Sequence, residues 1–355
     1  MKLHTRKSHL ALMTGVAAVA VAVGSMSAAQ EPDRLRGIVE PLVATERFSI
    51  GASLVHLQDD FWKGIAYGIA DEAERSNVEL VQISVAGAYG NVREQFGQLD
   101  TLQSLGADVI VVGPAAYDGY NLPLGRLTDA GVTVIAAGIP VNSANVAFGV
   151  GQDDRAIGVA QAEALCADVD GSAATVLTIP GPAGAEWAAQ RLVAFAATVA
   201  EQCPSVTIVE GAAGSSLALE QGLAQAADLM LKHPEALYIE TPAVSLGMGA
   251  LQAIRQQQRD DVRVITSGVV REVIPMVEDG SIMAIGSEPG IVMGRLIVQY
   301  AIRAREGLPM PGLGTETGTA YPALMIPATM ITAETVEGYP FDLYELPPSD
   351  WTIGN

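Results

Sequence analysis

Aromatic and polar side chains follow several apolar runs of the sequence, at the points where those runs end. An aromatic face can stack on a sugar ring or hold a cationic head group by cation–π attraction, and a phenol can hydrogen-bond a polar ligand. The residues concerned are Asp60, Phe61, Trp62, Tyr89, Tyr117 and Trp187. We expect Trp62 to line a binding cleft and Trp187 to close it from the opposite side. Replacement of Trp62 by alanine should then remove most ligand affinity and leave the fold intact.

Four of these residues have a structural interpretation beside the functional one. Phe61 can pack as a core residue at the start of a helix, and Asp60 can cap that helix by accepting backbone N–H bonds. Tyr89 and Tyr117 stand in short glycine-containing or proline-containing loops, where a tyrosine often forms a partly buried lid. Both interpretations stay open at this point.

The sequence holds none of the motifs that mark common catalytic sites. It has no Gly-x-Ser-x-Gly elbow, no phosphate-binding P-loop and no His-Glu-x-x-His motif. Gly247 and Gly249 lack the preceding strand and the third glycine of a dinucleotide-binding turn. Four scattered histidines and two cysteines give no zinc-ligand spacing. We therefore expect a protein that is not an enzyme and that uses no cofactor and no metal.

Near-continuous runs of Val, Ile, Leu and Ala alternate with helix-like stretches along the chain. Such runs are typical of strands buried on both faces of a parallel sheet. Four such runs lie in the first half of the chain and four in the second half. They are residues 48–56, 78–85, 108–114, 132–139, 174–179, 205–211, 236–241 and 262–268. The sequence therefore predicts two α/β lobes, each a doubly wound parallel sheet. Ligands bind beyond the carboxyl ends of such strands, which is where the aromatic residues fall.

The first 29 residues have the three parts of a secretory signal peptide: a basic start, an apolar stretch and small residues before a cleavage point. The alternative is a membrane anchor. The apolar run at residues 10–23 is shorter than the roughly 20 residues that a spanning helix needs. We expect cleavage after Ala29 and a mature protein in the periplasm.

Charge and cysteine content narrow the choice of partners. The net charge of −20 becomes 17 − 40 = −23 when the leader removes three basic residues. Nucleic-acid binding needs a basic surface, which this net charge argues against. A DNA-binding repressor would also need a basic helix-turn-helix at its start, where this chain has the expected signal peptide. Exported proteins retain disulfides. Cys166 and Cys203 fall near the ends of two predicted helices and are expected to pair, with two separate buried thiols as the alternative.

Longer stretches of the chain resemble the type I periplasmic solute-binding proteins. They are FSIGASLVHLQDDFWKGIAYGIADEA, LGADVIVVGP, GVTVIAAGIP, GVGQDDRAIGVAQAEAL, PGPAGAEWAAQRLVAF and LMIPATMITAETV. Within that family, SVAGAYGNVREQ, PGPAG and GYPFDLYELPP are most similar to a branch that senses trimethylamine N-oxide. The resemblance covers essentially the whole mature chain.

The resemblance implies an architecture that a simple halving of the chain would miss. In this family the chain crosses between the lobes three times, at a hinge about which the lobes close over the ligand. We expect lobe one at residues 46–147 and 270–314, and lobe two at residues 148–269 and 315–355.

The resemblance also adds three ligand-binding candidates. Arg191 matches a family position that commonly reaches into the cleft, although an ion pair on the helix surface, for example with Glu186, is an equal alternative. Glu288 provides a carboxylate that would suit a cationic or amine-bearing head group and disfavour an anion. Gln152 stands near a position where the family's aromatic cage has a second tryptophan.

Two roles follow from the resemblance. The first is presentation of a small polar or cationic solute, similar to trimethylamine N-oxide, to an inner-membrane sensor kinase. The alternative is delivery of a solute to an inner-membrane ABC permease. Sugar-binding relatives usually carry carboxylates where this chain has residues 241–243 and 268–270, which hold none. The sequence therefore favours the sensing role and disfavours a simple pentose or hexose.

Overall fold

The computed structural model describes Met1 and residues 33–315 and 318–354. From Arg34 onward the chain forms one compact unit, which contains two sheets and therefore two lobes. The expected signal peptide lies outside the described residues. Within the described ranges, every helix is too short or too polar to cross a bilayer.

Lobe one is built on a seven-stranded sheet. Neighbouring strands are parallel, except that the edge strand β11 runs antiparallel to β12. The order is β11 (Leu313–Gly314), β12 (Ala323–Ile326), β5 (Phe148–Gln152), β4 (Thr133–Gly138), β3 (Val109–Val112), β1 (Phe48–Leu54) and β2 (Val78–Val85).

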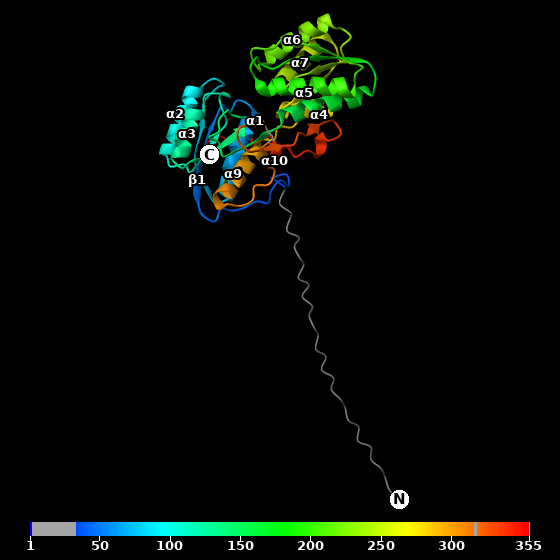
Figure 1. Ribbon diagram of the computed structural model, residues 1–355. Coiled ribbons are helices and arrows are strands. Elements are labelled where there is room, and N and C mark those ends of the chain that lie inside the picture. Colours follow the sequence, from blue (N-terminus) through cyan, green and yellow to red (C-terminus); the bar gives the residue numbers. More distant parts are fainter. Residues whose placement is uncertain (2–32, 316–317, 355) are drawn as a thin grey trace. The chain divides into compact units, whose positions relative to one another are not determined.

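Helices cover both faces of this sheet because its strands are apolar on both sides. Along β3, Val109 and Val111 belong to one hydrophobic core, whereas Ile110 and Val112 belong to another. The first core includes residues of α1 (Asp60–Arg75) and α9 (Gly290–Glu306), and the second includes residues of α2 (Val92–Ser104) and α3 (Asn121–Asp129). The helices surround the strands of lobe one in Figure 1.

Lobe two repeats this arrangement on a six-stranded sheet in which only the edge pair β10–β13 is antiparallel. One face packs on α4 and α5 and the other on α6, α7 and α8. The strand order is β13 (Met330–Ile331), β10 (Ile282–Gly286), β9 (Arg263–Ser267), β8 (Tyr238–Glu240), β6 (Ala174–Thr178) and β7 (Val206–Glu210). The helices are α4 (Asp154–Val169), α5 (Glu186–Gln202), α6 (Leu219–Lys232), α7 (Val244–Gln257) and α8 (Ile274–Glu278), and a short α10 (Phe341–Tyr344) lies in the tail.

The predicted fold class is confirmed. All eight apolar runs form strands whose ends fall within two residues of the expected ones, and all eight pair only in parallel ladders within their expected sheet. Buried Val, Ile and Leu on alternate sides of each strand produce the double layer of helices.

The lobe boundaries differ from the expected ones at three places. β5 pairs with β4 and β12 in lobe one, although residues 148–269 were assigned to lobe two. β10 pairs with β9 in lobe two, and β12 lies in lobe one rather than two. The chain therefore crosses between the sheets after β5, after β10 and after β12. The number of crossings is as expected, but their positions depend on ladders with distant strands, which a local pattern does not encode.

Glycines let paired helices approach each other closely. A Cβ on Gly158 of α4 would lie 2.1 Å from the carbonyl oxygen of Arg191 in α5. A Cβ on Gly68 of α1 would lie 2.2 Å from the carbonyl oxygen of Ile291 in α9. Side chains cannot be accommodated at such distances, so Gly158 sets how near the backbone at Arg191 comes to α4.

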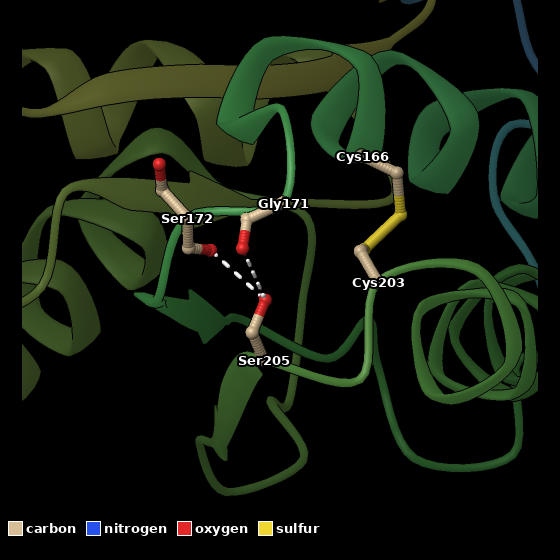
Figure 2. The surroundings of a disulfide bond; sticks show 5 residues. All are labelled: Cys166, Gly171, Ser172, Cys203 and Ser205. Atoms are coloured by element: carbon tan, nitrogen blue, oxygen red, sulfur yellow. Dashed lines mark hydrogen bonds between the residues drawn. A yellow bond between two sulfur atoms is a disulfide. The ribbon is translucent and has the colours of Figure 1, made fainter.

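A disulfide joins the far ends of α4 and α5. Cys166 in the last turn of α4 is bonded to Cys203, the residue that follows α5, with a Cα–Cα distance of 5.5 Å. Figure 2 shows that Ser205, two residues after Cys203, also connects these two helix ends. Its hydroxyl lies 3.0 Å from the carbonyl oxygen of Ser172 and 3.3 Å from that of Gly171, in the turn after α4.

Candidate functional site

A cavity of about 280 Å³, here called the central cavity, is lined by residues of both lobes. Its walls are the segments that follow β1, β2, β4 and β5 in lobe one and β8, β9 and β10 in lobe two, with further residues from α5, the loop before α6 and the tail. Eight of the nine predicted ligand-binding residues line it: Asp60, Phe61, Trp62, Tyr89, Gln152, Trp187, Arg191 and Glu288.

Tyr117 is the ninth predicted residue, and the structure places it elsewhere. It lines a second cavity of about 360 Å³, here called the adjoining cavity. The two cavities share four lining residues: Tyr89, Ile139, Trp187 and Leu217. Tyr117 and Tyr89 are both exposed, with 47% and 45% of their surfaces accessible. Tyr117 is therefore a neighbour of the central cavity and not part of its wall.

Trp62 is more deeply buried than the sequence indicated. Only 1% of its surface is accessible, and its ring packs against Gly113 and Gly138 in the core of lobe one. Its indole N–H donates a 3.3 Å hydrogen bond to the Tyr89 hydroxyl. The half-buried ring of Phe61 packs edge-on against it, with ring centroids 5.2 Å apart. Trp62 thus supports an aromatic wall rather than presenting a free face to a ligand.

The two aspartates at the start of α1 have different roles. The side chain of Asp59 caps the helix by accepting a 2.9 Å hydrogen bond from the backbone N–H of Trp62. Asp60 is the first helical residue and lines the central cavity. Burial raises the pKa of Asp60, and the charge of Lys63 partly opposes that rise. The capping role considered for Asp60 therefore belongs to its neighbour.

Arg191 crosses the wall of the central cavity as the hub of a buried ion-pair network. Its Nε and one terminal nitrogen donate to Asp154 at 2.9 and 2.7 Å, and its other terminal nitrogen donates to Glu288 at 2.5 Å. That nitrogen also lies 2.8 Å from the carbonyl oxygen of Pro242 and 3.0 Å from the Ser267 hydroxyl. The guanidinium stacks on Trp187, 4.9 Å from the ring centroid. Of the two interpretations of Arg191, the structure selects the cleft position; Glu186 instead accepts from Gln190.

The network contains more carboxylates than cations, and burial shifts the pKa values of its members. Burial acts to lower the pKa of Arg191, but Glu288 and Asp154 outweigh it, and the net pKa is raised. Burial raises the pKa of Asp154, which Arg191 only partly offsets. Gln152 donates a 3.4 Å hydrogen bond to Asp154, while its own Oε1 has no partner among the described residues. One cation faces two carboxylates, so the network prefers an additional hydrogen-bond donor to an additional acceptor.

A carboxylate of the C-terminal tail completes the site. Glu345 lines the central cavity, is 3% accessible, and accepts hydrogen bonds from the hydroxyls of Ser287 and Tyr339 and from the backbone N–H of Glu288. Burial raises its pKa to about 7. Sequence reasoning used the tail as a sign of the family but assigned no residue of it to the site. The available signal was weak, because Glu345 shares this aromatic stretch with a second carboxylate, Asp342.

A second buried carboxylate lies at the end of β8. Glu240 is 1% accessible, and its Oε1 has no partner among the described residues. Burial raises its pKa to about 8, against the opposing charge of Arg191. Among the residues that the structure describes, no group of three or more His, Cys, Asp or Glu side chains is placed to hold a metal ion.

The remaining wall of lobe two is largely apolar. The segments 241–243 and 268–270, noted in the sequence for their lack of carboxylates, contribute Pro242, Ala243, Gly268, Val269 and Val270 to the lining. Gly268 adopts a φ of +84° and lies against the Glu288 carboxyl group, so a side chain there would be strained. The carboxylates of the lining come instead from the start of α1, the segment after β10 and the tail.

This two-lobed fold with an inter-lobe cavity is that of the periplasmic binding proteins, and the chain belongs to that family. The family model for the periplasmic binding protein domain matches residues 50–309. Members of the family are periplasmic, which agrees with the expected location.

Particular relatives divide between two groups. Over 267 residues, 75% of each chain, this chain is 24% identical to the periplasmic protein TorT of Escherichia coli strain K12. It is 23% identical to a xylitol-binding protein of Mycolicibacterium smegmatis over 225 residues, 63% of each chain. A crystal structure of a sugar ABC transport system substrate-binding protein from Bordetella parapertussis is 46% identical, with a TM-score of 0.84, over 90% of this chain and all of that one. The family is thus established, whereas the expected special likeness to TorT is a hypothesis.

Proposed function

We propose that this protein is the solute-binding component of an ABC-type uptake system, and that it captures a small polyhydroxylated or amine-bearing solute in the central cavity without chemically changing it. The ligand would contact both lobes only when they are closed, so binding would shift the population toward the closed form. The 46% identity to a sugar ABC substrate-binding protein supports this role over the sensing role.

The observation that carries the proposal is that the one cation of the site is already paired with two carboxylates. Each of the three nitrogens of Arg191 already donates to Asp154, Glu288 or a neighbouring oxygen. Among the described lining residues, Arg191 is the only basic one. An anionic ligand would enter a buried site whose one cation is already paired and whose lining holds several carboxylates, which is costly.

The same cavity is well supplied with hydrogen-bond acceptors. Its described lining includes four carboxylates, and these are Asp59, Asp60, Glu288 and Glu345. Hydroxyl and ammonium groups donate to carboxylates, while the rings of Phe61 and Trp187 suit the apolar face of a sugar or polyol. These acceptors replace the carboxylates whose absence at residues 241–243 and 268–270 had disfavoured a sugar.

A second candidate function is sensing, in which the closed liganded form docks on an inner-membrane sensor kinase. The observation in its favour is the 24% identity to TorT over three quarters of both chains. For a trimethylamine N-oxide ligand, the site would need a more complete aromatic cage. Gln152 stands near the position where the cage of that family has a second tryptophan, and Trp62 is buried.

Calorimetric titration of unfolded and refolded, ligand-free mature protein tests both candidates. The probes are a pentose, a hexose, a sugar alcohol and an amino sugar, then trimethylamine N-oxide, glycine betaine and choline. A hexuronic acid, matched in size to the hexose, is the anionic control. We expect one of the first four to bind and the uronic acid to bind at least 100-fold more weakly than its neutral counterpart.

Two results would decide against the proposal. Tight binding of trimethylamine N-oxide or betaine with no response to any polyol would move the protein to the sensing class. Tighter binding of the uronic acid than of the hexose would show that Arg191 is available to anions.

A further inference from the structure

The adjoining cavity lies next to the central cavity and shares part of its wall. Tyr89, Ile139, Trp187 and Leu217 line both. At about 360 Å³ the adjoining cavity is no smaller than the central one, and each is close to the lower end of the about 300–1,000 Å³ that ligand pockets occupy. The proposed polyol occupies only the first of the two.

Three aromatic side chains give the adjoining cavity surfaces on which a ring can stack. Tyr117 and Tyr89 each keep nearly half of their surface accessible. The indole of Trp187 lies between the cavities with the Arg191 guanidinium 4.9 Å from its centroid, so its orientation is fixed by a buried group. Stacked aromatic faces favour ligands with a flat or apolar ring face.

The polar groups of this cavity are again acceptors. Asp154 lines it and is 7% accessible. Its Oδ1 accepts from Arg191 and Gln152, whereas its Oδ2 accepts no hydrogen bond from the described residues. Glu186 and Gln190 add a carboxylate and an amide, and the described lining contains no Lys, Arg or His. A ring with an apolar face and donating hydroxyl groups satisfies both kinds of surface.

We propose that the adjoining cavity is a subsite for a second sugar ring, and that the ligand of this protein is an uncharged disaccharide or glycoside of that length. The Arg191–Asp154 pair lies between the two subsites, because Arg191 lines the central cavity and Asp154 the adjoining one. One ring would occupy the central cavity, and the other would stack among Tyr89, Tyr117 and Trp187 and donate to Asp154. This inference rests on the proposed function.

Calorimetry with matched sugars tests it. The probes are xylose with xylobiose, glucose with maltose and cellobiose, and galactose with lactose and melibiose, titrated into the refolded mature protein. For the sugar that binds, we expect a disaccharide at least 10-fold tighter than its own monosaccharide. Ala116→Trp would fill the adjoining cavity, which Ala116 lines. It should reduce that advantage below about 3-fold and leave the monosaccharide affinity unchanged.

Two further variants keep the result interpretable. Leu122→Trp adds the same side chain at a residue of lobe one that is 72% accessible and lines neither cavity, and it should preserve the disaccharide advantage. Tyr117→Ala removes a stacking ring and should cost the disaccharide 3-fold to 10-fold with no effect on the monosaccharide. If Ala116→Trp fails to fold, the disaccharide affinity of Tyr117→Ala still tests the proposed subsite.

The outcomes separate the two proposals. Monosaccharide binding with no gain from a second ring would overturn the subsite and leave the proposed function standing. An advantage that survives both Ala116→Trp and Tyr117→Ala would also overturn it. Failure of every sugar and polyol to bind would remove the proposed function and the subsite together.

Discussion

Arg191 carries a permanent charge that is used entirely inside the protein. Taking a guanidinium and two carboxylates out of water is costly, and their mutual attraction compensates only when all of them are present. Because 2% of Arg191 is accessible, its removal would leave Asp154 and Glu288 buried without their cation.

We therefore expect Arg191→Ala to lower the free energy of unfolding by about 3–5 kcal/mol. Urea denaturation followed by circular dichroism measures it. Adding Asp154→Asn to the same chain should recover part of the loss, because one uncompensated charge disappears. The proposed role of Arg191 would be contradicted if Arg191→Ala lowered the free energy of unfolding by less than about 1 kcal/mol. It would also be contradicted if Asp154→Asn restored none of the lost stability.

The burial of Trp62 changes what its replacement would do. Trp62→Ala leaves a cavity in the core of lobe one and should cost about 3–5 kcal/mol of stability. The sequence-based expectation of an intact fold with lost affinity suits Trp187→Ala better, because that ring is half-buried at the cavity edge. Thermal melts and ligand titrations of both variants check this. Equal melting temperatures for the two variants would refute the distinction.

The residues after strand ends could be read from the sequence because parallel strands bring their carboxyl ends to one edge. That rule placed five of its six candidates on one cavity, and the family resemblance added Gln152, Arg191 and Glu288, which line it too. It missed Glu345, which reaches Ser287 across 58 residues of chain, and it could not show that Trp62 faces the core. Side-chain burial depends on packing from several elements, which no single stretch specifies.

At the scale of elements, the contact of α4 with α5 determines where Arg191 lies. Because Gly158 has no side chain, the backbone of α5 packs directly against it. A Cβ atom at Gly158 would lie only 2.1 Å from the Arg191 carbonyl oxygen. Neither helix carries a sequence signal for this partnership, because a glycine within a helix has several explanations.

Gly158→Ala should therefore push α5 away from α4, lower stability by about 1–3 kcal/mol through overpacking and weaken ligand binding by displacing Arg191. Gly97→Ala is the matched control, since a Cβ at that position in α2 meets nothing within 4 Å. It should raise stability by roughly 0.5–1 kcal/mol. Denaturant unfolding and calorimetry on both variants give the comparison, and similar effects of the two substitutions would contradict it.

The disulfide closes a loop with a sequence separation of 37 residues. Loop-closure entropy for that length corresponds to about 4 kcal/mol, so Cys166→Ala/Cys203→Ala should unfold at a clearly lower urea concentration. Ligand affinity should not change, because Cys166 lies about 18 Å along α4 from Asp154. If the variant lost ligand affinity but kept its stability, the disulfide would have a role in binding and not in stability.

The existence and order of the elements followed from the sequence, whereas their allocation to sheets did not. β5, β10 and β12 have 4 or 5 residues each, too few to show which sheet they extend. β5 is a typical case: it looks like the start of the second half, but it pairs with strands on both sides in the first sheet.

For the whole molecule, the buried carboxyl groups make stability depend on pH. The pKa of Glu240 is about 8 in the folded protein, against an ordinary 4.5. Between those values the folded state keeps a proton that the unfolded chain releases, so the free energy of unfolding falls as pH rises from 4.5 to 8 and levels off above that. Glu345, with a pKa of about 7, acts in the same direction.

Glu240→Gln should flatten that decline and make the protein more stable than the wild type at pH 8 but not at pH 4.5. Urea midpoints at pH 5, 6, 7 and 8 measure the slope. Glu201→Gln removes the same charge from an exposed position on α5 and is the control. An unchanged slope in Glu240→Gln would mean that the buried carboxyl group does not hold its proton.

The three crossings also govern how the chain responds to a protease. Each lobe contains segments from at least two separate parts of the sequence, and three backbone connections join the lobes after β5, β10 and β12. A single cut at any one connection leaves the other two intact. Nicked protein would therefore be held together by the sheet and helix contacts within each lobe and migrate as one species until it is denatured, when two fragments would separate.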